Sequence, residues 1–367
     1  MGSNPFIKNA VPLNRLQRAF PIKKESSYGV AIGDADLTKR IAMEGLSPFY
    51  PKTVKYTDDD LIGKGHEHRM KSEVLEFTGE YPAFAFQANP LTDALFWAMA
   101  LGGYSVSEID AGKSYLHKVT MASLAENPVP KSITGAWEHI NKTTPAVVER
   151  YKTPGEVVKS IEETFDRREL AKMSVTLQSS GEMAALDGGY NFPGLSALHY
   201  YPAESLDVQI GPMGGTLRSL NEVIHQVTIR CDVEFDDRVC KYPGGPVQTG
   251  GVGMVDGIQV VTGRVVTVEF QIVETEDYWW SKFCANEPMK AQITCRSRDL
   301  IPDTSNKFYT RFLFSCLDPE EMTDSAVNKL LGKTLRFRAS VFSSATEAAM
   351  LTVAVLDDTA EYLVAAT

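Results

Sequence analysis

The sequence contains no apolar run approaching the ~20 residues of a membrane-spanning helix, and no apolar stretch of the secretory type follows its first residues. Its five cysteines include no C-x-x-C pair, and most lie inside apolar runs. Such cysteines are usually buried free thiols of a protein from a reducing compartment. These absences predict a chain that folds in a cytoplasm and does not enter a membrane.

Positive charge is also in short supply. The chain has 37 Lys and Arg against 47 Asp and Glu, for a formal net charge of -10. Tight, non-specific binding of nucleic acid needs a surplus of Lys and Arg to contact phosphates, so that class of protein is not expected. An acidic surface past which a polyanion slides without being held is compatible with this balance.

The sequence contains no complete catalytic or phosphate-binding motif. Segment 194–198 (GLSAL) begins like a nucleophile elbow, but Leu198 stands where G-x-S-x-G requires glycine. The glycine-rich segment 242–257 has no Walker lysine and lies between two strand patterns, which predicts a long connection between strands. The three consecutive carboxylates in 57–61 lack the alternating spacing of a calcium loop. A chain of this length without a catalytic set suits a structural protein.

Two histidines stand close together in the stretch IGKGHEHRMKS, residues 62–72. His66 and His68 are spaced H-x-H, so both imidazoles lie on one face if the segment is extended. Zinc usually takes three or four ligands, and Glu67 would point to the opposite face. The pattern therefore favours a polar loop, and a metal-dependent enzyme that uses His66 and His68 stays an alternative.

The stretch DYWWSKF, residues 277–283, holds two of the four tryptophans. Tyr278, Trp279, Trp280 and Phe283 offer rings on which a ligand such as a sugar can stack. After a long strand pattern, however, such a stretch more often forms the apolar side of a short helix that covers a sheet. We favour that helix, and a carbohydrate-binding or host-surface-binding β-sandwich module stays an alternative.

The C-terminal half is dominated by strand patterns. Segments 264–274, 307–317, 335–342 and 350–358 alternate apolar and polar residues, which is typical of antiparallel strands with one wet face. The residues predicted to face the core are Val266, Val268, Phe270, Ile272, Phe308, Phe312, Phe314, Cys316, Leu335, Phe337, Ala339, Val341, Leu351, Val353 and Val355. A further hairpin is predicted over 72–88, with its turn at Gly79.

Helix signals are fewer. In segment 89–103, Asn89 and Pro90 mark a helix start, Gly102 marks its end, and Leu91, Leu95, Ala98 and Leu101 form an apolar stripe. A second helix is predicted over 153–165, because Thr153 and Glu156 match a capping box. A short helix is predicted over 277–285, and Asp318 is a candidate start of another. Together these patterns predict an α+β, mainly β protein.

Beyond single motifs, the order of elements is informative over the stretches YGVAIGDADLTKRIAMEGLSPFYP (28–51), KTVKYTDDDLIGKGHEHRMKSEVLEFTGEYPAFAF (52–86), NPLTDALFWAMALGG (89–103) and the strand patterns after residue 263. This order resembles that of the tail tube (major tail) proteins of long-tailed, siphovirus-type bacteriophages. The resemblance spans about 28–125 and 200–363. Segment 138–195 departs from it and is interpreted as an insertion displayed on the outside, helical in part.

The resemblance implies a tail-tube-type β-sandwich with a flanking α-helix, whose strands contribute to a hexameric inner β-barrel. Residues 1–26 would be an N-terminal arm and 27–367 the tail tube domain. Stacked rings would form the hollow conduit for DNA ejection, with no catalysis and no cofactor. The implied partners are further copies of the chain, a tape measure protein, tail terminator or distal tail proteins, and viral DNA that passes without specific binding. The implied location is the virion tail, after assembly in the host cytoplasm and without a membrane.

The resembled family places a loop between strands where this chain has its histidine pair. The polar residues of that loop are therefore predicted to contact neighbouring subunits or rings. This predicted contact loop consists of Asp58, Asp59, Asp60, Lys64, His66, Glu67, His68 and Arg69.

Overall fold

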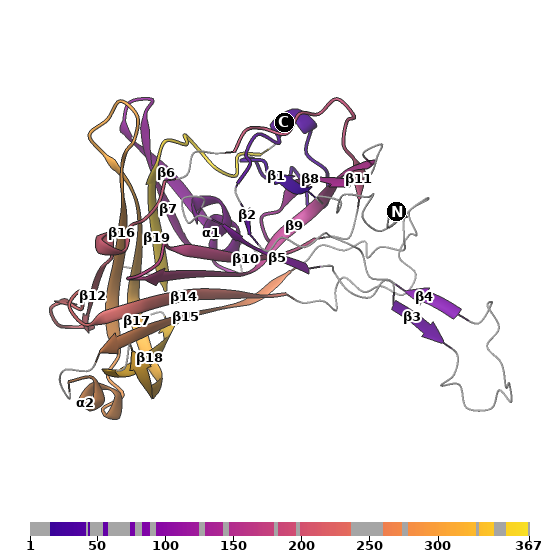
Figure 1. Ribbon diagram of the computed structural model, residues 1–367. Coiled ribbons are helices and arrows are strands. Elements are labelled where there is room, and N and C mark those ends of the chain that lie inside the picture. Colours follow the sequence, from indigo (N-terminus) through magenta and orange to yellow (C-terminus); the bar gives the residue numbers. More distant parts are fainter. Residues whose placement is uncertain are drawn as a thin grey trace, which may run out of the picture.

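The structure is a computed structural model of the 367-residue chain. It describes residues 15–41, 43–44, 54–57, 74–77, 83–88, 93–124, 129–141, 147–179, 183–195, 199–235, 260–273, 278–327, 330–340 and 350–365. Within these ranges the protein is mainly β, with a large open antiparallel sheet and two short α-helices (Figure 1). This confirms the predicted predominance of strands.

The described elements share a simple order, in which strands follow one another and each α-helix lies between two of them. They are β1 (Arg15–Ala19), η1 (Asp34–Asp36), β2 (Met43–Glu44), β3 (Val54–Thr57), β4 (Val74–Phe77), β5 (Ala83–Ala88), α1 (Asp93–Leu101), β6 (Gly102–Asp110), β7 (Ser114–Met121), β8 (Ile133–Asn141), β9 (Val147–Asp166), β10 (Lys172–Gln178), β11 (Ala184–Ala185), η5 (Ala203–Ser205), β12 (Asp207–Pro212), β13 (Arg218–Ser219), β14 (Ile224–Phe235), β15 (Val261–Val273), α2 (Tyr278–Cys284), β16 (Met289–Leu300), β17 (Lys307–Val327), β18 (Leu330–Ser340) and β19 (Leu351–Asp357).

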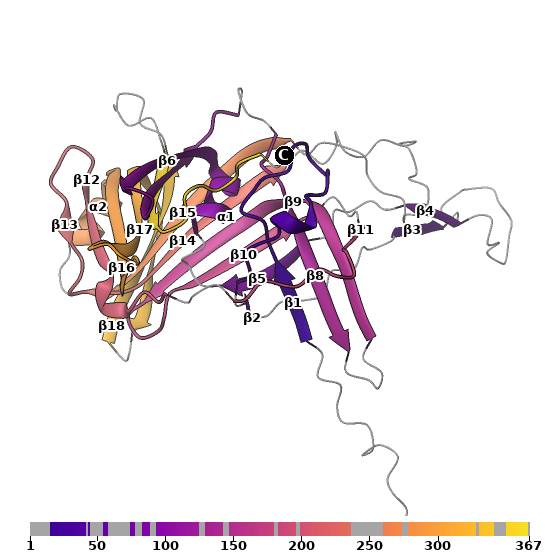
Figure 2. The same cartoon turned by 90° about the horizontal axis from the view of Figure 1, so that it is seen from above.

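Two long strands divide the sheet into three parts. The first arm runs β2-β5-β10-β9-β14-β15-β18-β17, using the C-terminal halves of β9 and β17. The second arm runs β13-β12-β16-β17-β19-β7-β6, using the N-terminal half of β17. A side layer joins β1, β8 and β11 to the N-terminal half of β9. Figure 2 shows the side layer extending from the main body.

Strand β9 corrects the predicted helix over 153–165. Its C-terminal half pairs with β10 on one side and β14 on the other. Ile161 and Phe165 are buried in the main core, as the pattern required, but Val158 joins them there instead of Val157, because the register of β9 against β10 shifts between Ser160 and Val158. Residues four apart share a face in a strand as well as in a helix, so this spacing does not separate the two. Pairing with strands distant in sequence decides the outcome.

Strand β17 corrects the predicted helix start at Asp318. The register of β17 against β18 shifts between Pro319 and Glu321, at the point where β17 leaves β16 and β19. Proline cannot donate to a strand ladder and is tolerated at such irregularities. The acidic, proline-containing stretch therefore marks a bend in a strand.

Helix α1 lies between the two arms and shares their hydrophobic core. It contacts β9 and β14 of the first arm and β6, β7 and β19 of the second. Every residue from Ala94 to Leu101 is buried, so the predicted single apolar stripe is too narrow a description. Gly102 follows with φ 87°, a left-handed conformation that favours glycine, and ends the helix where the sequence predicted.

The predicted hairpin over 72–88 is wrong. Strand β4 pairs with β3 and forms a separate two-stranded sheet, whereas β5 pairs with β10 and β2 in the first arm. In both views the β3–β4 pair lies away from the main body (Figures 1 and 2). Among the described strands, β3 and β4 pair only with each other.

Two of the expected boundaries change. Residues 15–25, assigned to an N-terminal arm, include β1 and the buried Arg18, Ala19 and Phe20, so they belong to the folded body. Segment 138–195, interpreted as an external insertion, contains the long strand β9 that joins the first arm to the side layer. Its apolar residues lie in the main core, so it is integral to the fold.

The predicted core-facing residues of the C-terminal strands are buried, from Val266 in β15 to Val355 in β19. Val341 lies outside the described residues. The short helix predicted over 277–285 is α2, and Trp279 and Phe283 pack on the core. Strands β14 and β15 are antiparallel neighbours, so the glycine-rich segment connects two paired strands, as predicted.

Candidate functional site

The predicted contact loop lies between β3 and β4. Its residues, Asp58, Asp59, Asp60, Lys64, His66, Glu67, His68 and Arg69, all lie outside the described residues. The register pairs Thr57 with Val74, which brings the two ends of the intervening segment together at one end of the two-stranded sheet. The predicted role of these eight residues stays a prediction.

The outer face of the first arm, opposite the core, is a broad polar surface. On β14 the buried Ile229, Cys231 and Val233 alternate with Thr228, Arg230 and Asp232. The same alternation runs across β9, β15 and β18, because the strands are in register. The outer face of these four strands is therefore polar.

Carboxylates outnumber cations on this outer face. Arg230 forms ion pairs with Asp232 at 2.8 Å and with Glu162 at 3.8 Å, and Arg336 pairs with Glu320 at 3.3 Å. These pairs are about half exposed, so each contributes little to stability. Alternation and burial place the following on the face: acidic Glu162, Asp166, Asp232, Glu234, Glu269, Asp318, Glu320 and Glu321, and basic Lys172, Arg230, Arg336 and Arg338.

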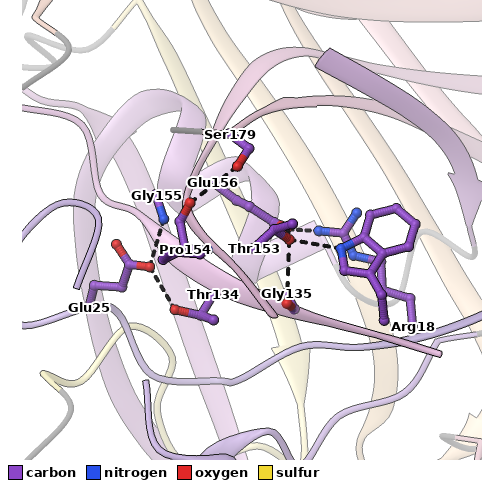
Figure 3. A network of polar contacts seen from close by, with 10 residues as sticks. Arg18, Glu25, Thr134, Gly135, Thr153, Pro154, Gly155, Glu156 and Ser179 are labelled. Atoms are coloured by element: carbon purple, nitrogen blue, oxygen red, sulfur yellow. Dashed lines mark hydrogen bonds and ion pairs between the residues drawn. The ribbon is translucent and has the colours of Figure 1, made fainter. Parts of the chain in front are cut away.

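A buried ion pair lies where β9 passes from the side layer into the first arm. Arg18 of β1 pairs with Glu156 of β9, and both side chains are fully buried (Figure 3). The Arg18 guanidinium carbon lies 4.3 Å from the Trp137 ring centroid and 4.5 Å from that of Phe20. Cation–π contacts of this kind are strongest where water is excluded. The pair is thus held in an aromatic cage.

Hydrogen bonds extend this joint. Thr153 donates to Glu156 and accepts a 2.8 Å hydrogen bond from the Trp137 indole N–H. Thr153 and Glu156 therefore do interact, as the capping pattern indicated, but across the bend in a strand. A methyl group on Gly135 would collide with the Arg18 and Glu156 side chains, so only glycine lets β8 pass this close.

Glu25 forms the second half of the joint (Figure 3). Its carboxylate accepts hydrogen bonds from the Ser132 hydroxyl at 2.6 Å and the Thr134 hydroxyl at 2.7 Å. It also accepts from the backbone N–H groups of Gly155 at 2.8 Å and Gly29 at 2.9 Å. Burial nevertheless raises the pKa of Glu25. Gly155 has φ 71°, so the bend that presents its N–H favours glycine.

Burial raises the pKa of Glu156 to about 7, against the opposing effect of Arg18, and lowers the pKa of Arg18 to about 10. Between pH 4.5 and 7 the folded chain therefore binds more protons at Glu156 than the unfolded chain does. The stability from this group is present in full below pH 4.5 and is lost as pH rises through 7.

We therefore expect Glu156→Gln to flatten the fall in urea unfolding midpoint between pH 5 and pH 8. Glutamine does not titrate, so the quantity to compare is the change of the urea midpoint with pH in each protein, not the midpoint itself. Glu169→Gln is the matched control, because the Glu169 carboxylate is exposed and beside Lys172. Equal pH dependence in wild type and Glu156→Gln would contradict the assignment.

A second polar cluster attaches the C-terminal segment to the second arm. His117 of β7 lies 2.8 Å from the Asp357 carboxylate through Nε2 and 2.8 Å from the Tyr104 hydroxyl through Nδ1. The Tyr362 hydroxyl donates a 2.7 Å hydrogen bond to the Asp357 carboxylate, and the Tyr362 backbone N–H donates a 2.9 Å hydrogen bond to the Tyr104 hydroxyl. Burial raises the pKa of Tyr362 well above its usual value. The cluster holds the strand β19 and the C-terminal segment against β6 and β7.

Neither polar cluster was predicted from the sequence. Arg18 and Glu156 are separated by 138 residues, and His117 and Asp357 by 240. The one signal in the sequence was the alternation of buried and exposed residues, because His117 occupies the same face of β7 as the buried Val119. Alternation indicates that such a residue is buried but does not name its partner.

Three further findings bear on function. Within the described residues, no group of three His, Cys, Asp or Glu side chains is arranged to hold a metal ion. No helix in the described part of the chain has the length and apolar character to cross a membrane. Trp279 is 6% exposed, and α2 packs Phe283 against Phe337 at 5.1 Å between ring centroids. Tyr278, Trp279 and Phe283 thus pack on the core of the sheet, as favoured from the sequence, and the side chain of Trp280 lies outside the described residues.

Comparison of the chain with protein-family models and with curated proteins found no match.

Proposed function

We propose that this chain is a tail tube subunit of a long-tailed bacteriophage, which assembles into stacked hexameric rings around a DNA conduit. The observation that carries the proposal is the separate β3–β4 pair, which lies away from the main body and brackets the predicted contact loop (Figure 1). A two-stranded pair is marginally stable by itself, so it is suited to pack against another chain. Because the order of elements resembles that of tail tube proteins, we propose that the other chain is a further copy of this one.

The edges of the first arm support self-association. At one edge lie the short β2 and the part of β5 beyond it, and at the other lies the C-terminal half of β17. From Glu321 onward, β17 pairs with β18 alone among the described strands. Open edges carry unpaired N–H and C=O groups that another strand can satisfy. Joining the β17 edge of one copy to the β2–β5 edge of the next generates a closed ring.

The charge of the outer face supports its assignment to the lumen. Joined first arms would present this face as a continuous wall, with the excess of carboxylates described above. A negatively charged wall repels phosphates and lets DNA pass without being held. The proposed partners are other copies, a tape measure protein and tail terminator or distal tail proteins, and neither a cofactor nor catalysis is part of the proposal.

Charge reversal in the contact loop tests the proposal. We expect Glu67→Lys and Arg69→Glu each to impair assembly while leaving the melting temperature of the monomer within 2 °C or so of wild type, as is usual for surface substitutions. Sedimentation velocity at increasing protein concentration measures the assembly. Glu169→Lys, a reversal on an exposed turn of the main body, is the matched control. Undiminished assembly of both loop variants would contradict the role of the loop.

The carbohydrate-binding alternative has less support, because Trp279 is turned into the core and is not free to stack on a sugar. Quenching of tryptophan fluorescence by sugars would favour that module. Stoichiometric zinc binding that is lost on His66→Ala would favour the metal-dependent enzyme.

A further inference from the structure

A polar cavity of about 470 Å³ lies between the segment after β1, the start of β6 and the approach to β8. Its walls include Lys24, Lys131 and Arg264, together with Glu25, Tyr104 and Ser132. None of the residues that line the cavity is among those named on the outer face of the first arm. The cavity is therefore a different feature from the one assigned to the lumen.

The cavity concentrates positive charge. Burial and the nearby charge of Lys24 both lower the pKa of Lys131. The Lys131 ammonium also lies 5.7 Å from the centroid of the Tyr104 ring. No ion pair between either lysine and a carboxylate is found among the described residues. Two ammonium groups that repel each other in a partly desolvated site are stabilised by an anion placed between them.

The other walls offset this charge only in part, because Glu25 is the one carboxylate in the described lining, against Lys24, Lys131 and Arg264. Both carboxylate oxygens of Glu25 already accept hydrogen bonds from Ser132, Thr134, Gly29 and Gly155. Arg264 donates to the Ala100 carbonyl at 2.7 Å, so its guanidinium is fixed at the wall as a third cation. An added Cβ at Gly102 would lie 3.1 Å from the Arg264 Nη2, which is a tight contact, and the φ of 87° at this position favours glycine.

We propose that this cavity binds a small phosphate-type anion, either inorganic phosphate or the phosphate group of a monoester, between the side chains of Lys24 and Lys131. Ammonium groups are strong donors to phosphate oxygens, and hydrogen bonds between charged groups are about twice as strong as neutral ones. The cavity is larger than a single phosphate ion, which leaves room for the organic part of an ester.

The test is isothermal titration of the full chain with inorganic phosphate, glycerol phosphate and acetate, each at the same ionic strength made up with chloride. We expect saturable binding of one or both phosphate compounds and none of acetate. Lys131→Gln and Lys24→Gln should each weaken binding at least tenfold. Lys113→Gln is the matched control, because Lys113 is exposed at the β6–β7 turn and should bind as wild type does.

A second readout separates specific binding from a general charge effect. Bound phosphate should raise the lowered pKa of Lys131, so binding at alkaline pH, where the ammonium group titrates, should take up protons, which titration in buffers of different ionisation enthalpy measures. Binding of inorganic phosphate alone or of the ester alone supports the site and identifies its source. Absence of binding, or equal affinity in Lys131→Gln and wild type with both folded by melting temperature, would overturn it. Neither result bears on ring assembly.

Discussion

Replacement of Arg18 by methionine is expected to lower the free energy of unfolding by about 3–5 kcal/mol. Methionine fills much of the same space between the Trp137 and Phe20 rings, but it leaves the Glu156 carboxylate buried without its cation. The cost comes from that carboxyl group rather than from lost packing, because it is either desolvated as an anion without a partner or, with its pKa raised further by the loss of Arg18, protonated. Urea unfolding followed by tryptophan fluorescence measures the change, because Trp137 lies in the joint itself.

The double variant Arg18→Met, Glu156→Leu distinguishes a loss of stability caused by the buried charge from one caused by lost packing. Removing both charges leaves no buried ion to desolvate, so most of the lost stability should return. Arg298→Met is the surface control, because Arg298 pairs with Glu204 and its side chain is 77% exposed. Its effect should stay within about 1 kcal/mol. A double variant as unstable as Arg18→Met would show that packing, not charge, is responsible.

Replacement of Trp97 by alanine is expected to cost about 3–5 kcal/mol, since this fully buried side chain touches both arms. Its ring lies 5.5 Å from that of Phe312 in the second arm, edge to face. Its indole N–H donates a 2.7 Å hydrogen bond to Glu163 in the first arm. Truncation therefore leaves a cavity between the arms and removes a donor from a buried carboxylate.

Trp97→Phe retains a ring but not the donor, and should lie between wild type and Trp97→Ala. Met99→Leu on the same helix conserves volume and should cost less than about 1.5 kcal/mol. The measurement is again the urea midpoint, read by far-ultraviolet circular dichroism because a tryptophan is lost. A Trp97→Ala midpoint close to that of Met99→Leu would contradict the importance of α1 packing between the two arms.

Local pattern was sufficient where a strand has one wet face. The alternation in β15, β17, β18 and β19 correctly identified which residues are buried, because burial on one side of a sheet imposes a period of two. Pattern was insufficient where a helix and a strand would place the same residues on one face, as at Ile161 and Phe165, or where an element is enclosed on all sides, as α1 is. In those cases distant strands select the structure.

The candidate sites divide in the same way. The aromatic residues of α2 could be interpreted from their position after a strand. The Arg18–Glu156 joint and the lysine cavity depend on contacts between residues far apart in the chain, which one sequence without pairing information does not reveal. The eight residues of the predicted contact loop lie outside the described residues, so their role rests on the resemblance and on the position of β3 and β4.

Negative-stain electron microscopy of concentrated protein tests the central claim most directly. The account predicts six-fold rings with a central channel, or hollow tubes made of stacked rings, over a range of salt concentrations. Small globular particles of monomer size at every salt and protein concentration would contradict it.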